Sequence, residues 1–286
     1  MIDVVYPYIE ATWEELRYSL RSLDMYFKED YRVHVIGDCC PEWITNVNYV
    51  YMPRNKKKRE ADVGQKYKWM CENFDSFVLM NDDFFLLKPT TLKDVRKVRY
   101  KGVRVLKEMP ETPWGHMIQA SVLALGVEPV YNFVTHTPRY FESKKLVDID
   151  KKYHIFDGEA LGVLVYFNEF ISRKVKRSLS SKIDWLSLGN ISNTRPASEH
   201  QFFNCNEAAL DDSLKAYIKA RFPTPGRFEK ESKVVSTPAH SSLLLYTGKK
   251  KTFHWDDIEF KHGIANTTPE RAERLANQHP EIFQLG

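Results

Sequence analysis

The sequence lacks the features that mark membrane-spanning, secreted or zinc-bound proteins. It has four cysteines among 286 residues, and none of them form the C-x-x-C spacing that is typical of a zinc site. Its first residues, MIDVVYPYIE, lack the basic start and long apolar run of a signal peptide. No stretch approaches the ~20 apolar residues that a membrane span needs. We therefore expect a cytoplasmic protein with reduced thiols and no membrane partner.

The sequence also has little excess charge. Its net charge is +4 and its pI is about 8.7, which is a weaker basic bias than dedicated nucleic-acid binders carry. The basic residues gather in three runs, at residues 56–59, 96–107 and 173–182. Each run is either a solvated surface or a surface that attracts a polyanion such as a nucleotide diphosphate or DNA.

Strand and helix patterns alternate along the first ninety residues. We expect strands at Asp3 to Tyr8, Tyr31 to Ile36, Val47 to Met52 and Phe77 to Met80. We expect helices from Thr12, as the N-cap of a capping box with Glu15, to Phe27, and from Asp62 to Phe74. This order predicts an α/β fold, with a mostly parallel sheet that is flanked by helices.

Three of these four strands end in polar or turn-forming residues. They are Pro7-Tyr8, Gly37-Asp38 and Asn81-Asp82-Asp83. Ligands of parallel α/β sheets bind beyond the carboxyl ends of the strands. The sequence therefore predicts a binding site where these three strand ends meet.

The rest of the chain is less regular. Segments 102–106 and 122–125 suit strands or short helices, 144–153 and 159–170 suit helices, and 180–196 suits a loop. A helix is expected over 208–222. Residues 243–286 suggest a small appendage of short strands at 243–246, 252–255 and 258–260 and a helix from Thr268 to about Asn277. This organisation predicts a main domain over 1–242 and an appendage over 243–286, unless the last forty residues close the edge of the main domain.

The acidic segment Asn81-Asp82-Asp83 follows four apolar residues. In an extended chain, Asn81 and Asp83 would face the same side and Asp82 the other. Carboxylates at such a strand end can hold Mg²⁺ or Mn²⁺ together with substrate phosphates. The alternative is a turn whose Asp side chains bind local backbone amides. Two adjacent carboxylates favour the metal hypothesis, since a plain turn does not need their mutual repulsion.

The first third of the chain resembles a glycosyltransferase of the GT-A type. The resemblance rests on VVYPYIEATWEELRYSLRSL, VHVIGD and FVLMNDDFFLLKP, in an order that is similar to the nucleotide-binding strand, second strand and Asp-x-Asp strand of that family. It implies a Rossmann-like GT-A fold and a nucleotide-sugar donor, with a UDP-sugar as the first candidate. The Asn-Asp-Asp-Phe element also resembles, more loosely, the Stealth-type sugar-phosphate transferases.

The resemblance implies roles for particular residues. It makes Asp83 the ligand of Mn²⁺ or Mg²⁺, and Asn81 departs from the family's first Asp, so it brings no charge there. The other donor contacts that it implies are Pro7, Tyr8, Asp38, Lys66, Asn81 and Asp82. Arg54 and Lys68 are alternatives to Lys66 as the basic donor contact.

Two segments could supply catalytic side chains. His136 lies in the cluster Thr135-His136-Thr137-Pro138, and a neutral histidine can ligate a metal or act as a base. Glu199 is similar to the carboxylate that GT-A enzymes place at a helix start as the catalytic base. Asp157 and Glu159 are alternative carboxylates, and each of these residues could instead be purely structural.

The expected function is transfer of a sugar from a nucleotide sugar to an acceptor hydroxyl. The basic runs suit DNA as the acceptor, for example hydroxymethylated bases in phage DNA, in the host cytoplasm if the protein is phage-encoded. A protein or glycan acceptor is the other choice. The alternatives to glycosyl transfer are a Stealth-like sugar-phosphate transferase that acts on a glycan and a DNA-binding module without catalysis.

Overall fold

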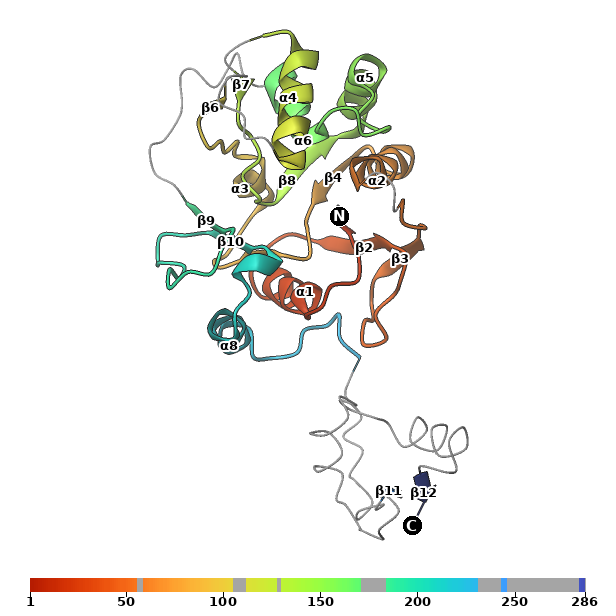
Figure 1. Cartoon of the computed structure of the whole chain (residues 1–286), viewed down its shortest axis with the longest axis vertical. Helices are drawn as coiled ribbons and strands as arrows, with labels where there is room; N and C mark the ends of the chain where they lie inside the picture. The colour runs from red at the N-terminus through yellow and green to blue at the C-terminus, as the bar shows by residue number, and fades with distance from the viewer. Residues whose placement is uncertain are drawn as a thin grey trace. The chain divides into compact units, whose positions relative to one another are not determined.

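The structure is a computed structural model of the chain, and it describes residues 1–55, 59–104, 112–127, 130–170, 184–230, 243–245 and 283–285. The chain divides into two compact units, residues 1–230 and 231–286. The observed boundary therefore lies between residues 230 and 231, whereas the sequence predicts one between residues 242 and 243. Figure 1 draws both units with their helices and strands labelled.

A five-stranded sheet forms the centre of the first unit. Its order is β3-β2-β1-β4-β8, with bounds Ile2–Pro7 for β1, Tyr31–Gly37 for β2, Asn48–Tyr51 for β3, Ser76–Leu79 for β4 and Arg139–Glu142 for β8. The first four strands run parallel, and β8 pairs with β4 in the antiparallel sense. The expectation of a mostly parallel sheet flanked by helices is confirmed, and the arrangement is compatible with a Rossmann-like fold.

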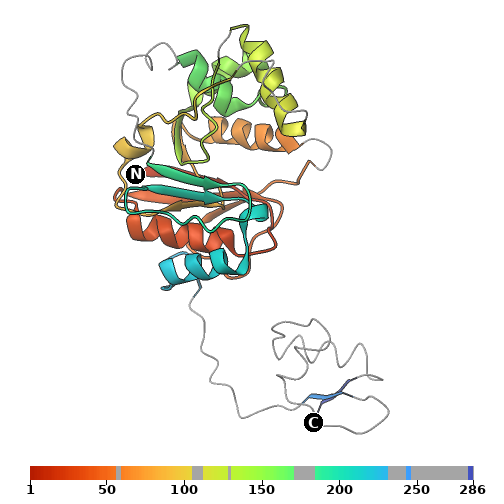
Figure 2. The same cartoon turned by 60° about the vertical axis from the view of Figure 1, so that its left-hand side comes forward.

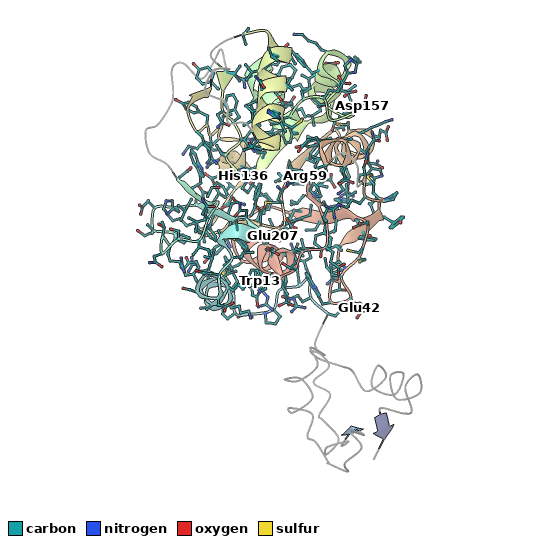
Figure 3. All side chains as sticks on the ribbon, in the orientation of Figure 1. Trp13, Glu42, Arg59, His136, Asp157 and Glu207 are labelled. Atoms are coloured by element: carbon teal, nitrogen blue, oxygen red, sulfur yellow. The ribbon has the colours of Figure 1, made fainter. Side chains whose placement is uncertain are left out.

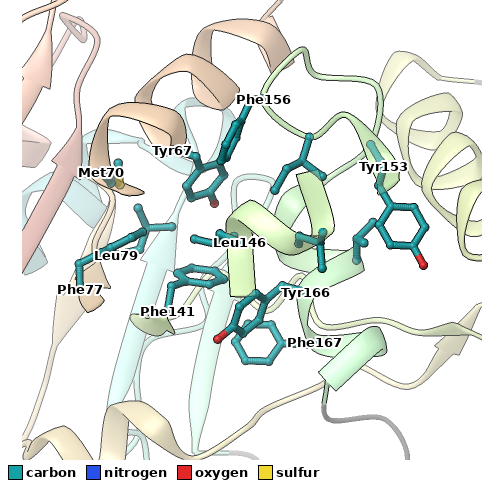
Figure 4. Close-up of a cluster of buried hydrophobic side chains, with 14 of the residues drawn as sticks. Tyr67, Met70, Phe77, Leu79, Phe141, Leu146, Tyr153, Phe156, Tyr166 and Phe167 are labelled. Atoms are coloured by element: carbon teal, nitrogen blue, oxygen red, sulfur yellow. The ribbon is translucent and has the colours of Figure 1, made fainter. Parts of the chain in front are cut away.

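Each central strand buries both of its faces. On β4, Phe77 and Leu79 belong to one hydrophobic cluster, whereas Val78 and Met80 belong to another. Since successive side chains of a strand point to opposite faces, the continuous apolar run FVLM supplies both layers. Figure 4 shows the first cluster. In it, Phe77 and Leu79 lie with Phe141 of β8 and with Tyr67 and Met70 of the helix Arg59–Asn73.

Helices cover the two faces of this sheet. The bounds are Glu15–Tyr26 for α1, Arg59–Asn73 for α2, Leu92–Arg96 for α3, Pro113–Leu125 for α4, Ser143–Tyr153 for α5 and Gly162–Phe170 for α6. Figure 2 shows α1 on one side of the sheet and α2 on the other. Leu16, Leu20 and Leu23 of α1 pack on the cluster that contains Val78, because they recur at helical spacing on one face.

A second sheet, with the order β5-β10-β9, packs against α1. Its strands are β5 (Phe84–Leu86), β9 (Trp185–Leu188) and β10 (Phe202–Cys205). The 3-10 helix η2 (Glu207–Ala209) and the helix α8 (Asp212–Arg221) follow it and take the place of the single helix expected over 208–222. The loop expected over 180–196 is wrong in part, because Trp185–Leu188 pairs with β10 as a strand.

Other local expectations also change. The capping box of Thr12 and Glu15 is wrong, because α1 begins at Glu15 and its N-cap Glu14 makes no side-chain capping bond. Segment 122–125 is the last turn of α4. The short strand β6 (Val103–Arg104) pairs with β7 (Val130–Tyr131) in the antiparallel sense, with α4 between them in the chain.

In the second unit, β11 (Leu243–Leu245) pairs with β12 (Phe283–Leu285) in the antiparallel sense. The strands expected at 252–255 and 258–260 and the helix expected from Thr268 lie outside the described residues, as does the basic run at 173–182. Within the described part of the chain, no helix has both the length and the apolar character that crossing a membrane requires. All four cysteines are free thiols.

Candidate active site

The polar ends of β1, β2 and β4 lie next to one another, because β1 is the central strand between β2 and β4. The Tyr8 backbone N–H donates to the Ile36 carbonyl at 2.8 Å, and the Met80 N–H donates to the Val5 carbonyl at 2.9 Å. A Cβ atom on Gly37 would lie 2.6 Å from the Tyr8 carbonyl oxygen, so this close approach requires glycine. The predicted convergence of the three strand ends is confirmed, and we call this region the carboxyl-edge site.

The acidic segment makes a tight turn after β4. The Phe84 N–H donates to the Asn81 carbonyl at 3.1 Å, which closes a turn with Asp82 and Asp83 at its centre. The Ser19 hydroxyl of α1 lies 3.3 Å from the same carbonyl oxygen and holds the turn against the helix. The expectation that Asn81 and Asp83 face one side in an extended chain is therefore wrong, because the chain reverses at this point.

Asp83 is the most perturbed carboxyl group of the turn. Burial, followed by the nearby charge of Asp82, raises the pKa of Asp83 to about 8. Its Oδ2 accepts a short hydrogen bond from the Asn204 amide of β10. Its Oδ1 is buried and has no hydrogen-bond partner within the described part of the chain. A buried carboxylate oxygen without a donor is costly, and a bound cation or a ligand hydroxyl would satisfy it.

Two further carboxyl groups share this environment. Burial raises the pKa of Asp82 to about 6, although hydrogen bonds from the backbone N–H groups of Asp82 and Asp83 oppose that shift. Burial also raises the pKa of Glu15, in the first turn of α1, to about 7, and the charges of Asp82 and Glu207 add to the effect. Glu15 Oε2 is a second buried oxygen that no described group bonds. The carboxyl-edge site thus gathers three carboxyl groups whose ionised forms the fold disfavours, and a bound cation would favour those ionised forms.

Cationic side chains of α2 border the acidic groups. Lys66 is 2% exposed, and its ammonium lies 2.7 Å from Asp62 Oδ2 and 3.4 Å from the Tyr8 carbonyl oxygen. The charges of Lys66 and Arg59 both favour the ionised form of Asp82. Lys66 therefore ties α2 to the end of β1 through its pair with Asp62, while Arg59 belongs to the surroundings of the turn.

His136 reaches the same site from the segment between β7 and β8. Its ring centroid lies 6.4 Å from that of Phe84, the residue after the acidic turn. Burial and the charges of Lys101, Arg139 and Arg59 lower the pKa of His136 to about 4, so its imidazole is neutral near pH 7. Its φ of 53° places it in the left-handed region, an uncommon backbone state for a side chain of this size. Figure 3 labels His136, Arg59 and Glu207 near the middle of the unit, with Asp157 well apart from them.

The structure places the remaining predicted residues differently. Pro7 ends β1, Tyr8 directly follows it and Asp38 directly follows β2, so all three lie at the predicted edge. Glu199 is exposed and lies in a turn, and the segment after it is the strand β10. The expectation that Glu199 begins a helix is therefore wrong.

The donor set suits a divalent cation that is held in part by its ligand. Among the described residues, no group of three or more His, Cys, Asp or Glu side chains is placed to hold a metal ion. Mg²⁺ is usually bound by one or two carboxylates together with waters and substrate phosphates. The unpartnered Oδ1 of Asp83 and the charge of Asp82 fit that mode of binding.

Sequence reasoning missed three residues of this site. Glu15 was assigned to a helix cap, and Arg59 was assigned to a basic run of residues 56–59. Asn204 was not considered, although it directly follows Phe202-Phe203 as the acidic turn follows β4. Asn204 lies inside β10 and is buried, so no polar strand end marks it in the sequence.

No protein-family model matches this chain, and a search of curated proteins finds no match either.

Proposed function

We propose that this chain is a nucleotide-sugar-dependent glycosyltransferase with a GT-A-like fold, and that the carboxyl-edge site binds the donor. The observation that supports the proposal best is a group of three carboxyls with raised pKa values, Asp82, Asp83 and Glu15, with the charge of Arg59 close to Asp82. A divalent cation would favour the ionised form of these carboxyls and bridge them to the donor diphosphate, and Arg59 would be a further contact of the phosphates.

The proposed reaction is a substitution at the anomeric carbon of the sugar. The acceptor oxygen bonds to that carbon while the bond to the diphosphate oxygen breaks, and the acceptor proton passes to a base. A divalent ion bound at Asp83 would stabilise the charge on the leaving diphosphate. Asn204 would orient Asp83 through its amide, and Lys66 would hold the end of β1 in place through the Tyr8 carbonyl.

His136 is our candidate for the base. It is neutral near pH 7 and lies beside the acidic turn, whereas Glu199 is exposed in a turn before β10. His136→Gln should therefore lower kcat of transfer far more than Glu199→Gln does. Equal losses of kcat in the two variants would contradict this choice and would favour Glu199 as the catalytic base, as the sequence predicts.

The test is a thermal-shift panel of UDP-, GDP-, CMP- and dTDP-sugars with and without Mn²⁺. We expect one nucleotide sugar to raise the Tm of the native chain with Mn²⁺, and to have no effect on Asp83→Asn. Asp212→Asn, which removes an exposed carboxylate of α8, is the matched control and should respond as the native chain does. No shift with any nucleotide sugar would contradict the proposal and favour a binding module without catalysis.

Product analysis then separates the two transfer reactions. Release of a nucleoside diphosphate identifies glycosyl transfer, and release of a nucleoside monophosphate would identify the Stealth-like sugar-phosphate transfer instead. The choice of a UDP-sugar and of DNA as the acceptor stays a prediction from the sequence. Binding of hydroxymethylated DNA that weakens with added salt would support that acceptor.

A further inference from the structure

A cleft of about 1050 Å³ lies along β8, the outer strand of the central sheet. It is lined by residues of α3, β8, α5 and α6, which Figure 1 shows around that edge of the sheet. None of the turn residues Asn81, Asp82 and Asp83 lines it. We call this cavity the β8 cleft, and it is separate from the carboxyl-edge site.

Positive charge prevails in the lining of the β8 cleft. Seven Lys and Arg residues line it, against three Asp and Glu residues. Several of them form ion pairs, namely Lys97 and Arg99 with Asp184, Lys145 with Glu142, and Lys151 with Asp148. Three cations remain for which the described residues offer no carboxylate within ion-pair distance: Arg96, Arg139 and Lys144.

Arg139 is the central cation of this group. It is 7% exposed, and its Nη2 donates to Thr135 Oγ1 at 2.9 Å while its Nε lies 3.4 Å from the Thr137 carbonyl oxygen. The two threonine hydroxyls lie 3.0 Å apart. Burial lowers the pKa of Arg139 to about 10, so it is still charged near pH 7. Among the described residues, only neutral groups contact this buried guanidinium; such an arrangement is costly, and an anion in the cleft would offset that cost.

Arg96 presents a second guanidinium to the cleft from the opposite face of β8 to Arg139, because successive side chains of a strand point to opposite faces. It lies 4.1 Å from the ring centroid of Tyr140, the residue after Arg139. Stacking on the ring holds the planar group in place and leaves its N–H donors free to bind an anion. The cleft is therefore lined by two arginines, on α3 and β8, by Lys144 of α5 and by the hydroxyl groups of Thr135 and Thr137.

We propose that the β8 cleft binds a phosphate-bearing ligand through Arg139 and Arg96. A phosphate group carries more charge and more acceptor oxygens than a carboxylate, which suits three unbalanced cations. The segment of this chain that follows α6, residues 171–182, is itself rich in Lys and Arg, so its charge does not complement the cleft. The phosphate can belong to a small molecule or to a nucleic-acid backbone, and the two sources are separable by experiment.

The test is an NMR titration of the ¹⁵N-labelled full chain with inorganic pyrophosphate. We expect the backbone amide signals of residues 135–140 and 96–99 to move, and Arg96→Ala to weaken this binding by about tenfold. Lys93→Ala is the matched control, because Lys93 is an exposed cation of the same short helix α3 that does not line the cleft. We expect it to change the affinity by less than about twofold.

Further probes identify the source of the phosphate. A short single-stranded DNA that binds much more tightly than pyrophosphate, with a steep dependence on salt, identifies a nucleic-acid backbone. Similar affinities identify a small phosphate ligand. Arg139→Lys keeps the charge but loses the planar fork, and should also weaken binding.

Three outcomes would overturn the proposal. The first is that acetate binds as tightly as pyrophosphate, and the second is that Arg96→Ala and Lys93→Ala lose affinity equally. The third is that the signals of residues 135–140 do not move while those of residues 81–84 do. Since Asp83→Asn should leave binding to the cleft unchanged, failure of the donor site and failure of the cleft are distinguishable.

Discussion

The carboxyl-edge site and the β8 cleft are neighbours with opposite charge. Both are bordered by the segment Thr135 to Arg139, from which His136 lies beside Phe84 while Thr135, Thr137 and Arg139 line the cleft. At the carboxyl-edge site the groups whose ionised form the fold disfavours are carboxyls, and in the cleft the corresponding group is the Arg139 guanidinium. The comparison suggests that each region is built to meet a ligand of the opposite sign.

The two regions also differ in whether a carboxylate pairs with their buried cation. Lys66 lies 2.7 Å from Asp62, so its charge is balanced within the fold. Arg139 contacts hydroxyl and carbonyl oxygens instead. A balanced buried pair serves the fold, whereas an unbalanced buried charge indicates a ligand.

The largest expected effect comes from Asp83 at the carboxyl-edge site. Asp83→Asn keeps the size of the side chain but removes its charge, so donor hydrolysis and transfer should fall by about a thousandfold, or ~4 kcal/mol in the barrier. Release of nucleoside diphosphate measures this loss. The Tm of the free protein should not fall, because burial already raises the pKa of Asp83 to about 8 and the fold does not depend on its ionised form. Full activity in this variant would break the assignment of the donor site.

The next effect compares the two buried cations. Lys66→Met leaves the Asp62 carboxylate buried without its partner, so the free energy of unfolding should fall by about 3 kcal/mol or more. Arg139→Met removes a charge that has no such partner, so we expect a fall of about 1 kcal/mol for its lost hydrogen bonds. Urea unfolding of both variants measures the difference. Equal losses would mean that Arg139 is balanced within the fold and would weaken the case for the β8 cleft.

A smaller effect concerns the pH dependence of stability at the carboxyl-edge site. The pKa of Glu15 is raised to about 7 in the folded state, whereas it is near 4.3 in the unfolded chain. The contribution of Glu15 to the free energy of unfolding is therefore fully present below about pH 4.3 and is lost as the pH rises through about 7. Between pH 4 and pH 8, and without divalent cations, the free energy of unfolding of Glu15→Gln should therefore rise by on the order of 2 kcal/mol relative to that of the native chain. Glu14→Gln, at the half-exposed preceding residue, should follow the native pH dependence in urea unfolding across this range.

The smallest effect concerns the orientation of Asp83. Asn204→Ala removes the amide that donates to Asp83 Oδ2, which should lower kcat of transfer by about fivefold to tenfold, or ~1 kcal/mol. Asn193→Ala, at an exposed loop position, is the control and should leave kcat unchanged. A thousandfold loss in Asn204→Ala would instead make Asn204 a direct contact of the substrate.

Local patterns predicted most of the central sheet. The apolar runs of β1, β2 and β4 and the alternation of β3 led to strands close to the observed bounds, and the helical spacing of Leu16, Leu20 and Leu23 led to α1. These elements are predictable because burial on one or both faces leaves a period in the sequence. The strand β9 left no comparable pattern, since its WLSL segment lies among serines and asparagines and depends on its pairing with β10.

The candidate site was predictable in part for the same reason. Tyr8, Asp38 and the acidic turn follow apolar strands directly, so the sequence indicates that they lie at one edge. Glu15 and Asn204 come from elements far apart along the chain and reach Asp83 through the packing of α1 and β10. No local pattern encodes such a meeting, so both were missed.

The sequence by itself determined where polar residues follow apolar strands. Three strands end in polar or turn-forming residues, and an acidic pair comes after the most apolar of them. The tertiary structure alone decided which charges are balanced. It paired Lys66 with Asp62, left Asp83 Oδ1 without a donor, and placed Arg139 in a cleft with hydroxyl groups. The physical reason is that the cost of a charge depends on its burial and on the groups within a few ångströms, which residues distant in sequence supply.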